Sequence, residues 1–301
     1  MDAIKNKPAI NLALRSLLEA LVDYAGLFPP AGLAMRPAVE NYARYKAGPY
    51  AWMLGRFVVP IARLAEFEQA WGEAGNPDGW KLSALVAKPE NEFPAVRAFN
   101  EKHDGKIRID AVELKAASAD EIAKIASILP SGIVGYVEIP VAQDPASLLT
   151  VIKDAGLRAK IRTGGLTSVL FPDASLIVRF LQASAEVGVA FKATAGLHHP
   201  LRSERPFTYE PNSDRGTMHG FLNVFLAAVF AGSGVETQVL ENVLLEESVS
   251  ALRFSDQGVE WRDAVLSTSE IADMRENFAI AFGSCSFEEP ISDLQQLGLL
   301  P

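Results

Sequence analysis

The sequence predicts an α/β fold, a (β/α)₈ barrel of the TIM type with an N-terminal helical extension and an insertion before the last strand. Three observations predict it. Short segments rich in Val, Ile and Ala alternate with helical segments along the chain, which is typical of a parallel sheet. The length of 301 residues suits one large α/β domain. Charged residues also fall late in four successive strands, where such barrels keep catalytic groups.

Composition and charge limit the class of protein. The chain is 49% hydrophobic and 22% charged, with a net charge of −9 and a pI of about 5.1. This composition is globular, and the acidic balance argues against nucleic acid and anionic membranes as main partners. The single cysteine, Cys285, permits neither an internal disulfide nor a CxxC metal site. We expect a small anionic metabolite as the partner, and a homo-oligomer stays open.

The sequence carries no targeting signal that we recognise. The start lacks a continuous apolar run with a small-residue cleavage site, as a signal peptide would have. The longest apolar stretch, residues 221–231, contains Asn223 and is too short to span a bilayer. We therefore expect a cytoplasmic protein.

The expected elements follow in order from the N-terminus. Apolar residues at helical spacing predict a helix over residues 11–25, which the Pro-rich segment 26–32 ends, and a second helix over 36–47. These form the expected extension, residues 1–50. Strands are then expected at residues 56–61, 81–87, 107–115, 132–140, 157–165, 187–196 and 278–284. Helices are expected between them at residues 62–73, 90–103, 118–128, 145–155 and 173–186.

Seven strands leave one barrel strand unlocated. The missing strand is not evident between residues 197 and 277, which hold a polar stretch, two helices at 220–231 and 235–248, and a hairpin at 251–265. We interpret residues 200–275 as an elaboration of a one-domain barrel. An open doubly wound sheet is the alternative architecture.

Charged side chains in four strands are the main functional signal. A buried parallel strand is normally apolar, and a charge inside one is costly unless it is paired. Residues two apart on a strand share a face, so the charges should meet at one mouth of the barrel, although structural ion pairs would give the same pattern. The residues are Glu113, Lys115, Glu138, Lys160, Arg162 and Lys192, with Thr194 on the face of Lys192.

Histidines and arginines cluster after the strand at 187–196. His198, His199 and His219 lie within 22 residues, and imidazole serves as acid, base or metal ligand. Loop arginines Arg202, Arg205 and Arg215 would add positive charge suited to a carboxylate or phosphate.

The segment 282–290 runs from the last strand into a helix. Ser286 and Glu289 have capping-box spacing, and the turn at Gly283 and Ser284 would hold an anion at the helix start. We interpret Cys285 as a small packed residue.

One segment carries a resemblance to a known family. Residues 157–199 contain Thr163-Gly164 after one strand, then Gly188, then Phe191-Lys192-Ala193-Thr194-Ala195-Gly196. This segment resembles the strand-five to strand-six segment of deoxyribose-phosphate aldolases. The resemblance implies a (β/α)₈ barrel with a Schiff-base lysine at Lys192 and no metal. The family's second lysine and its strand-four aspartate have no clean counterpart, although Glu138 would replace the aspartate. The whole chain also resembles a family of bacterial proteins of unassigned function.

These observations lead to three hypotheses of function. The first is a carbon–carbon lyase acting on a small anionic carbonyl compound through Lys192, without a cofactor. Burial and the nearby Lys160 and Arg162 would lower the pKa of Lys192, Glu138 would move the proton and Thr194 would position a water. The second is a metal-dependent lyase or hydrolase using His198 or His199, His219 and Glu138. The third is a non-catalytic barrel that binds a small anion.

Overall fold

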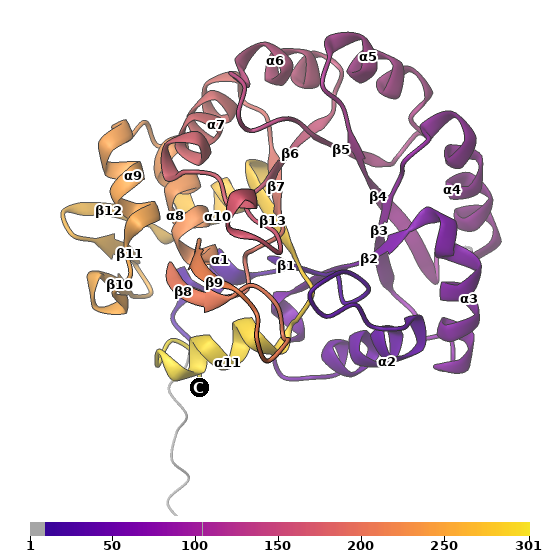
Figure 1. Ribbon diagram of the computed structural model, residues 1–301, viewed down its shortest axis with the longest axis horizontal. Helices are drawn as coiled ribbons and strands as arrows, with labels where there is room; N and C mark the ends of the chain where they lie inside the picture. Colours follow the sequence, from indigo (N-terminus) through magenta and orange to yellow (C-terminus); the bar gives the residue numbers. More distant parts are fainter. Residues whose placement is uncertain (1–9, 104) are drawn as a thin grey trace, which may run out of the picture.

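The computed structural model describes residues 10–103 and 105–301, and eight parallel strands in it form a closed barrel (Figure 1). The expected (β/α)₈ barrel is therefore confirmed, and the open sheet is wrong. The order around the barrel is β1-β13-β7-β6-β5-β4-β3-β2. The strands are β1 (Val22–Tyr24), β2 (Leu54–Pro60), β3 (Trp80–Leu85), β4 (Ile107–Lys115), β5 (Val134–Glu138), β6 (Arg158–Arg162), β7 (Phe191–Thr194) and β13 (Ala279–Ser284).

The unlocated strand is the first one in the chain. The prediction of a helix over 11–25 is right for α1 (Leu12–Leu18) but wrong for Val22–Tyr24, which pairs in parallel with both β2 and β13. Ala20 has a φ of 48° and turns the chain between the two elements. A buried strand of three residues shows no periodicity that distinguishes it from a helix end. Residues 1–50 are therefore not a purely helical extension, and residues 1–9 of it lie outside the described residues.

Helices cover the outside of the barrel, as expected for this fold (Figure 1). Each begins and ends within two residues of the range that its periodicity predicts, and each buries one apolar face, such as Ile122 and Ile125 on α5. These helices are α2 (Met35–Lys46), α3 (Leu64–Glu73), α4 (Pro89–His103), α5 (Ala119–Ile128), α6 (Ala146–Asp154) and α7 (Ala174–Val187). Short 3₁₀ helices lie at Ala51–Met53, Ile61–Arg63, Ser168–Leu170 and Val249–Ala251.

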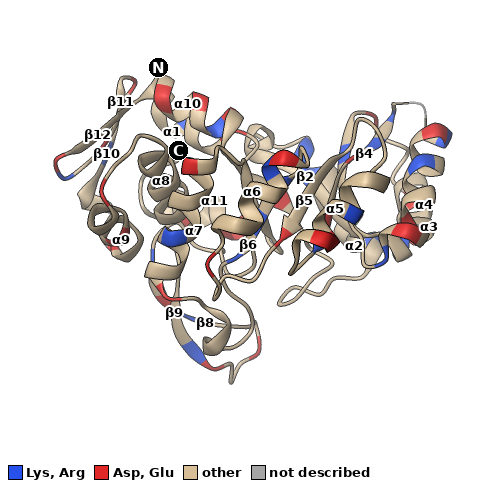
Figure 2. Cartoon of the chain, turned by 90° about the horizontal axis from the view of Figure 1, so that it is seen from above, with Lys and Arg blue, Asp and Glu red and all other residues tan. Residues whose placement is uncertain are grey.

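The expected elaboration separates β7 from β13. An antiparallel hairpin, which Figure 2 shows projecting from the molecule, occupies the polar stretch after β7, and the predicted hairpin at 251–265 gains a third strand. The elements of the elaboration are β8 (Ser203–Pro206), β9 (Arg215–Met218), α8 (Phe221–Gly232), α9 (Thr237–Leu245), β10 (Leu252–Phe254), β11 (Gly258–Trp261), β12 (Ala264–Ser267) and α10 (Thr268–Asn277). Helix α11 (Glu288–Gln296) follows β13.

Helix α8 is apolar on all sides because it is buried on all sides. Every residue from 221 to 231 is buried, and α8 packs against α7, α9, α10 and β13. This explains its high hydropathy as that of a core helix. Within the described residues, no helix has the length and apolar character needed to cross a membrane.

Arg275 on α10 connects the segment before the first barrel strand, β1, to the start of the last one, β13. Its buried guanidinium donates to the carbonyl oxygens of Leu17 at 2.8 Å, Glu19 at 2.9 Å and Ile280 at 2.7 Å. These carbonyls belong to segments about 260 residues apart in the sequence. One side chain therefore joins the end of α1 to the start of β13.

We predict that Arg275→Met lowers the free energy of unfolding by about 3 kcal/mol, because several buried carbonyls lose a charged donor. Urea titration followed by circular dichroism measures this change. Arg253→Met is the matched control, because Arg253 pairs with Glu260 across a hairpin while 80% of its side chain is exposed. It should change the free energy by less than about 1 kcal/mol. Equal effects of the two substitutions would contradict this role of Arg275.

Candidate active site

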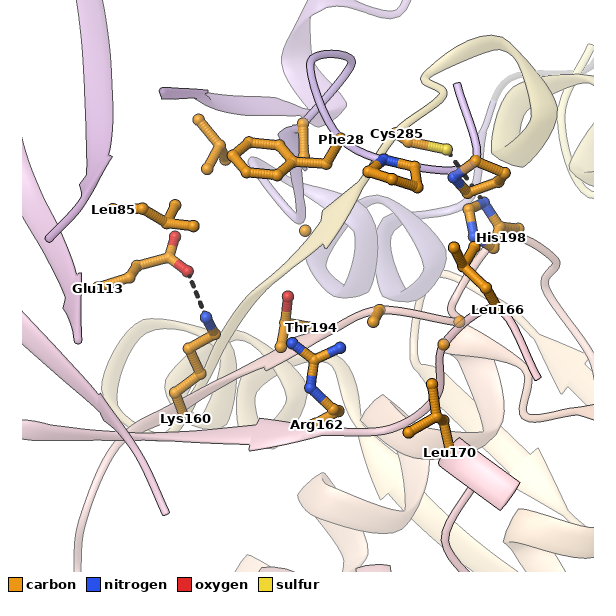
Figure 3. A pocket seen from close by; sticks show the side chains of 18 residues that line it. Phe28, Leu85, Glu113, Lys160, Arg162, Leu166, Leu170, Thr194, His198 and Cys285 are labelled. Carbon is orange, nitrogen blue, oxygen red and sulfur yellow. Dashed lines mark hydrogen bonds and ion pairs between the residues drawn. The ribbon is translucent and has the colours of Figure 1, made fainter. Parts of the chain in front are cut away.

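A cavity of about 330 Å³ opens at the carboxyl ends of the barrel strands (Figure 3). Its lining residues end, or follow directly upon, seven of the eight strands; examples are Leu85 on β3, Thr194 on β7 and Gly283 on β13. Apolar side chains such as Phe28 and Leu170 form part of the wall. This end of a (β/α)₈ barrel is where catalytic residues gather.

Five charged side chains form a continuous series of ion pairs inside the barrel, which we call the buried charge chain. Lys192 Nζ donates to Asp23 Oδ2 and to Glu113 Oε1, both at 2.6 Å. Lys160 Nζ lies 2.9 Å from Glu113 Oε2 and 2.9 Å from Glu138 Oε2. No member is more than 9% exposed. Three carboxylates thus alternate with two ammonium groups, so that each buried charge has an opposite partner.

Strand register explains how local sequence produces this alternation. Glu138 on β5 is the Cα partner of Lys160 on β6, and Lys160 is the partner of Lys192 on β7. Partner residues on neighbouring strands point to the same face of a sheet. Glu113 on β4 and Asp23 on β1 then reach across the barrel interior to the two ammonium groups. The charges predicted to meet therefore do lie together.

Further polar groups contact the carboxylates of the buried charge chain. Ser83 Oγ donates to Glu113 Oε1 at 2.7 Å, and the backbone N–H of Arg56 donates to Asp23 Oδ1 at 2.7 Å. Arg162 Nε lies 3.4 Å from Glu138 Oε1, and Lys115 Nζ lies 3.7 Å from the same oxygen. The Arg162 side chain is 41% exposed and that of Lys115 is 75% exposed. These two cations can therefore meet solvent or a ligand.

The pKa of Lys192 is raised, contrary to the expected lowering. Burial by itself lowers the pKa of Lys192, but the carboxylates of Asp23 and Glu113 raise it more, so that it lies above the ordinary lysine value. Burial raises the pKa of Glu113, but Lys160 and Lys192 outweigh this and hold it well below its usual range. The predicted lowering of the Lys192 pKa is wrong, because the sequence does not show that Asp23 and Glu113 both contact the Lys192 ammonium group. The Lys192 side chain is also only 1% exposed.

Lys160 is the lysine that lines the cavity within the described part of the chain. Arg162 and Thr194 line the same wall, and Figure 3 shows all three directed toward the open space. Glu113 borders it as well. The cavity thus presents an amine, a carboxylate, a hydroxyl and a partly exposed guanidinium to a small molecule.

Of the three clustered histidines, His198 and His219 were expected at the rim of the site, and all three occupy separate positions. His198 lines the cavity, whereas His199 Nδ1 faces Asp293 Oδ2 at 2.5 Å. His219 is buried, and its Nε2 lies 2.7 Å from the carbonyl oxygen of Pro172. Within the described residues, no three His, Cys, Asp or Glu side chains lie close enough to hold a metal ion. The alternative ligand set of His198, His219 and Glu138 is therefore not assembled, because the chain directs each side chain to a different partner.

The loop arginines also lie away from the cavity lining. Arg202 pairs with Glu247, Arg215 lies against Glu204, and Arg205 Nε donates to Ser203 Oγ at 3.2 Å. The expected pocket of loop arginines is therefore replaced by local pairs within the elaboration.

The turn after β13 matches its prediction in part. Gly283 lines the cavity, and Ser286 Oγ accepts a hydrogen bond from the Glu289 N–H at 3.1 Å. Ser284 is buried, and its Oγ faces the Ser286 N–H at 3.4 Å. It is therefore part of the turn and does not line the cavity.

Sequence reasoning missed two features of the site. Asp23 was assigned to a helix, although a lone aspartate between buried apolar residues, just before a Pro-rich loop, could have suggested a strand end. Cys285 Sγ lies 3.8 Å from His198 Nδ1, 87 residues away in the chain, and no local pattern reports such a pair.

Comparison with known proteins gives no match among protein-family models or curated proteins. Because Val22–Tyr24 is the first strand, the segment 157–199 spans the sixth and seventh barrel strands. The segment that resembles the fifth and sixth strands of the aldolase family therefore forms the sixth and seventh strands of this barrel. The site must be interpreted from its own geometry.

We predict that Lys192→Met lowers the free energy of unfolding at about pH 7 by roughly 3–5 kcal/mol, because two carboxylates stay buried without their cation. Lys115→Met is the matched control, since Lys115 also faces a carboxylate of the chain but is exposed. It should cost less than about 0.5 kcal/mol. Urea unfolding measures both. A Lys192 variant as stable as the control would show that the buried charge chain does not support the fold.

Proposed function

We propose that the protein is an aldolase-like carbon–carbon lyase that acts on a small anionic carbonyl compound through a Schiff base on Lys160. The observation that carries this proposal is the different placement of the two buried lysines. Lys160 borders the cavity, whereas Lys192 is enclosed between Asp23 and Glu113. A nucleophile must reach its substrate, so the assignment moves from Lys192 to its neighbour.

Glu138 is suited to move the proton that the chemistry requires. Its Oε2 lies 2.9 Å from Lys160 Nζ, within reach for general acid–base catalysis. Glu138 takes one proton from the ammonium group, and the neutral amine then attacks the carbonyl carbon. The nitrogen of the adduct passes a second proton to the alkoxide oxygen to give the carbinolamine, and the proton held by Glu138 then converts that hydroxyl to water, which leaves an iminium ion. When the carbon–carbon bond breaks, the iminium ion accepts its electron pair and becomes an enamine, while the hydroxyl of the departing fragment gives its proton to Glu138 and becomes a carbonyl.

Glu113 and Lys192 have a different part in this scheme. Glu113 Oε1 already accepts hydrogen bonds from Lys192 and Ser83, and the charges of Lys160 and Lys192 hold the pKa of Glu113 below its usual range. A fixed negative charge beside Lys160 Nζ stabilises the cationic iminium that replaces the ammonium ion. Lys192 is thus a positioning residue that acts through Glu113.

The cavity wall supports the substrate class. Arg162, two residues after Lys160 on β6, is partly exposed and lines the cavity, and a guanidinium is well suited to a carboxylate or phosphate. Thr194 provides a hydroxyl on the adjacent strand. A volume of about 330 Å³ with apolar walls fits a compound of metabolite size.

We predict that borohydride reduction of the full chain with a panel of small aldehydes and keto acids adds one ligand mass to Lys160. Peptide mass mapping locates the adduct. Lys160→Arg should abolish it, because arginine keeps the positive charge between the two glutamates but forms no imine. The Lys192 peptide should stay unmodified.

Two outcomes would contradict the proposal. One is an adduct on Lys192. The other is no adduct on Lys160 with any compound that the protein turns over. If the Lys160→Arg variant keeps the free energy of unfolding of the original protein in urea, a lost adduct reflects the missing amine and not a misfolded chain.

A further inference from the structure

A second group of reactive side chains lies on the cavity wall opposite Lys160. Cys285 follows β13, and its Sγ lies 3.8 Å from His198 Nδ1. The same nitrogen lies 3.5 Å from Glu289 Oε2 on α11. Both Cys285 and His198 line the cavity (Figure 3). A thiol, an imidazole and a carboxylate thus meet at one place, supplied by the loop after β7 and by the segment that runs from β13 into α11.

Polar side chains surround the Cys285 thiol and contact one another, which distinguishes it from a cysteine packed among apolar groups. Tyr209, from the β8–β9 connection, donates to Glu289 Oε2 at 2.7 Å and lies 3.6 Å from Cys285 Sγ. Cys285 lies in the turn that leads into α11, three residues before its first residue Glu288. Reactive cysteines occur at helix starts beside a histidine, whereas structural ones lie among apolar groups.

The imidazole carries a positive charge at neutral pH. Burial lowers the pKa of His198, but hydrogen bonds with Cys285 and Glu289 outweigh it and raise the pKa to about 9. Burial, together with Cys285 and Glu289, raises the pKa of Tyr209, which therefore stays a neutral donor. The other titratable group facing the thiol is Tyr24 on β1, whose pKa is raised by burial and then by Cys285. The groups around the thiol are thus the imidazole of His198, the phenols of Tyr209 and Tyr24, and the carboxylate of Glu289, which contacts both His198 and Tyr209.

We propose that Cys285 and His198 form a second nucleophilic centre of the cavity, which adds reversibly to the carbonyl carbon of a small bound aldehyde. In this step the sulfur forms a bond to carbon, and the carbonyl π pair moves to oxygen. The oxygen takes the proton from His198, so that a thiolate and an imidazolium become a neutral thiohemiacetal and a neutral imidazole. The step needs neither oxidant nor reductant.

This centre does not depend on the proposed Lys160 chemistry. Figure 3 shows Cys285 and His198 on one side of the cavity and Lys160 with Glu113 on the other. Within the described residues, no ion pair joins the two groups. An amine and a thiol in one cavity would let a ligand be held covalently at either end. A substitution can remove Lys160 or Cys285 without removing the other residue.

The test uses the single cysteine of the chain, because any alkylated thiol must be Cys285. Iodoacetamide labelling of the native protein at about pH 6.5 is followed by intact mass, with N-acetylcysteine as reference. A free thiol is only about 1% thiolate at this pH. We expect Cys285 to react about tenfold faster than the reference, and His198→Gln to remove this advantage.

His199→Gln is the matched control, because His199 faces Asp293 and not the thiol. It should leave the labelling rate within about twofold of the original, and all variants should react like the reference once unfolded in urea. A native Cys285 that reacts more slowly than the reference, or equally fast in His198→Gln, would overturn the proposal.

Addition to a carbonyl is tested in the Lys160→Arg variant, where no imine can form. Glyoxylate, an anionic aldehyde, should slow the labelling of Cys285 at least about threefold at millimolar concentration. Glycolate, which has a similar size and the same charge but no aldehyde group, should not slow the labelling. Equal protection by both, or by neither, would overturn the addition step. Loss of the Lys160 adduct with these results intact would count against the proposed function alone.

Discussion

The ion pairs between Lys192 and the carboxylates of Asp23 and Glu113 are the interaction on which the rest of the site depends. Asp23 is on β1 and Glu113 on β4, so Lys192 on β7 joins strands from across the barrel. Charges this deep are stable only when each has its partner. The closed barrel brings these partners together, and in return the pairing fixes the position of Glu113.

The two lysines differ in their access to the cavity, although both contact the same carboxylate. Glu113 presents Oε1 to the enclosed Lys192 and Oε2 to Lys160 at the cavity. Lys160 is also paired with Glu138, and it lines the cavity whereas Lys192 does not. Cys285 and His198 occupy the other wall, so the cavity has a reactive group on each side.

Much of the fold could be predicted from sequence, since the alternation of strands and helices determines this architecture. The first strand could not, because three buried residues show no period. The charges on the strands at 107–115, 132–140, 157–165 and 187–196 indicated where the site lies. The sequence could not show which lysine is accessible, since that depends on depth in the barrel and on Asp23. It could not pair Cys285 with His198 either, because only the closure of the barrel brings them together.

The most direct test of this account is the protonation state of the Lys192 side chain. Nitrogen-15 NMR of lysine-labelled protein reports each Nζ, and the Lys192→Arg variant identifies the Lys192 signal by its loss. The account predicts that this signal stays that of an ammonium ion from about pH 6 to about pH 10, close to the ordinary lysine pKa. A change to the signal of a neutral amine below about pH 9 would contradict it, because a neutral Lys192 would no longer lower the pKa of Glu113.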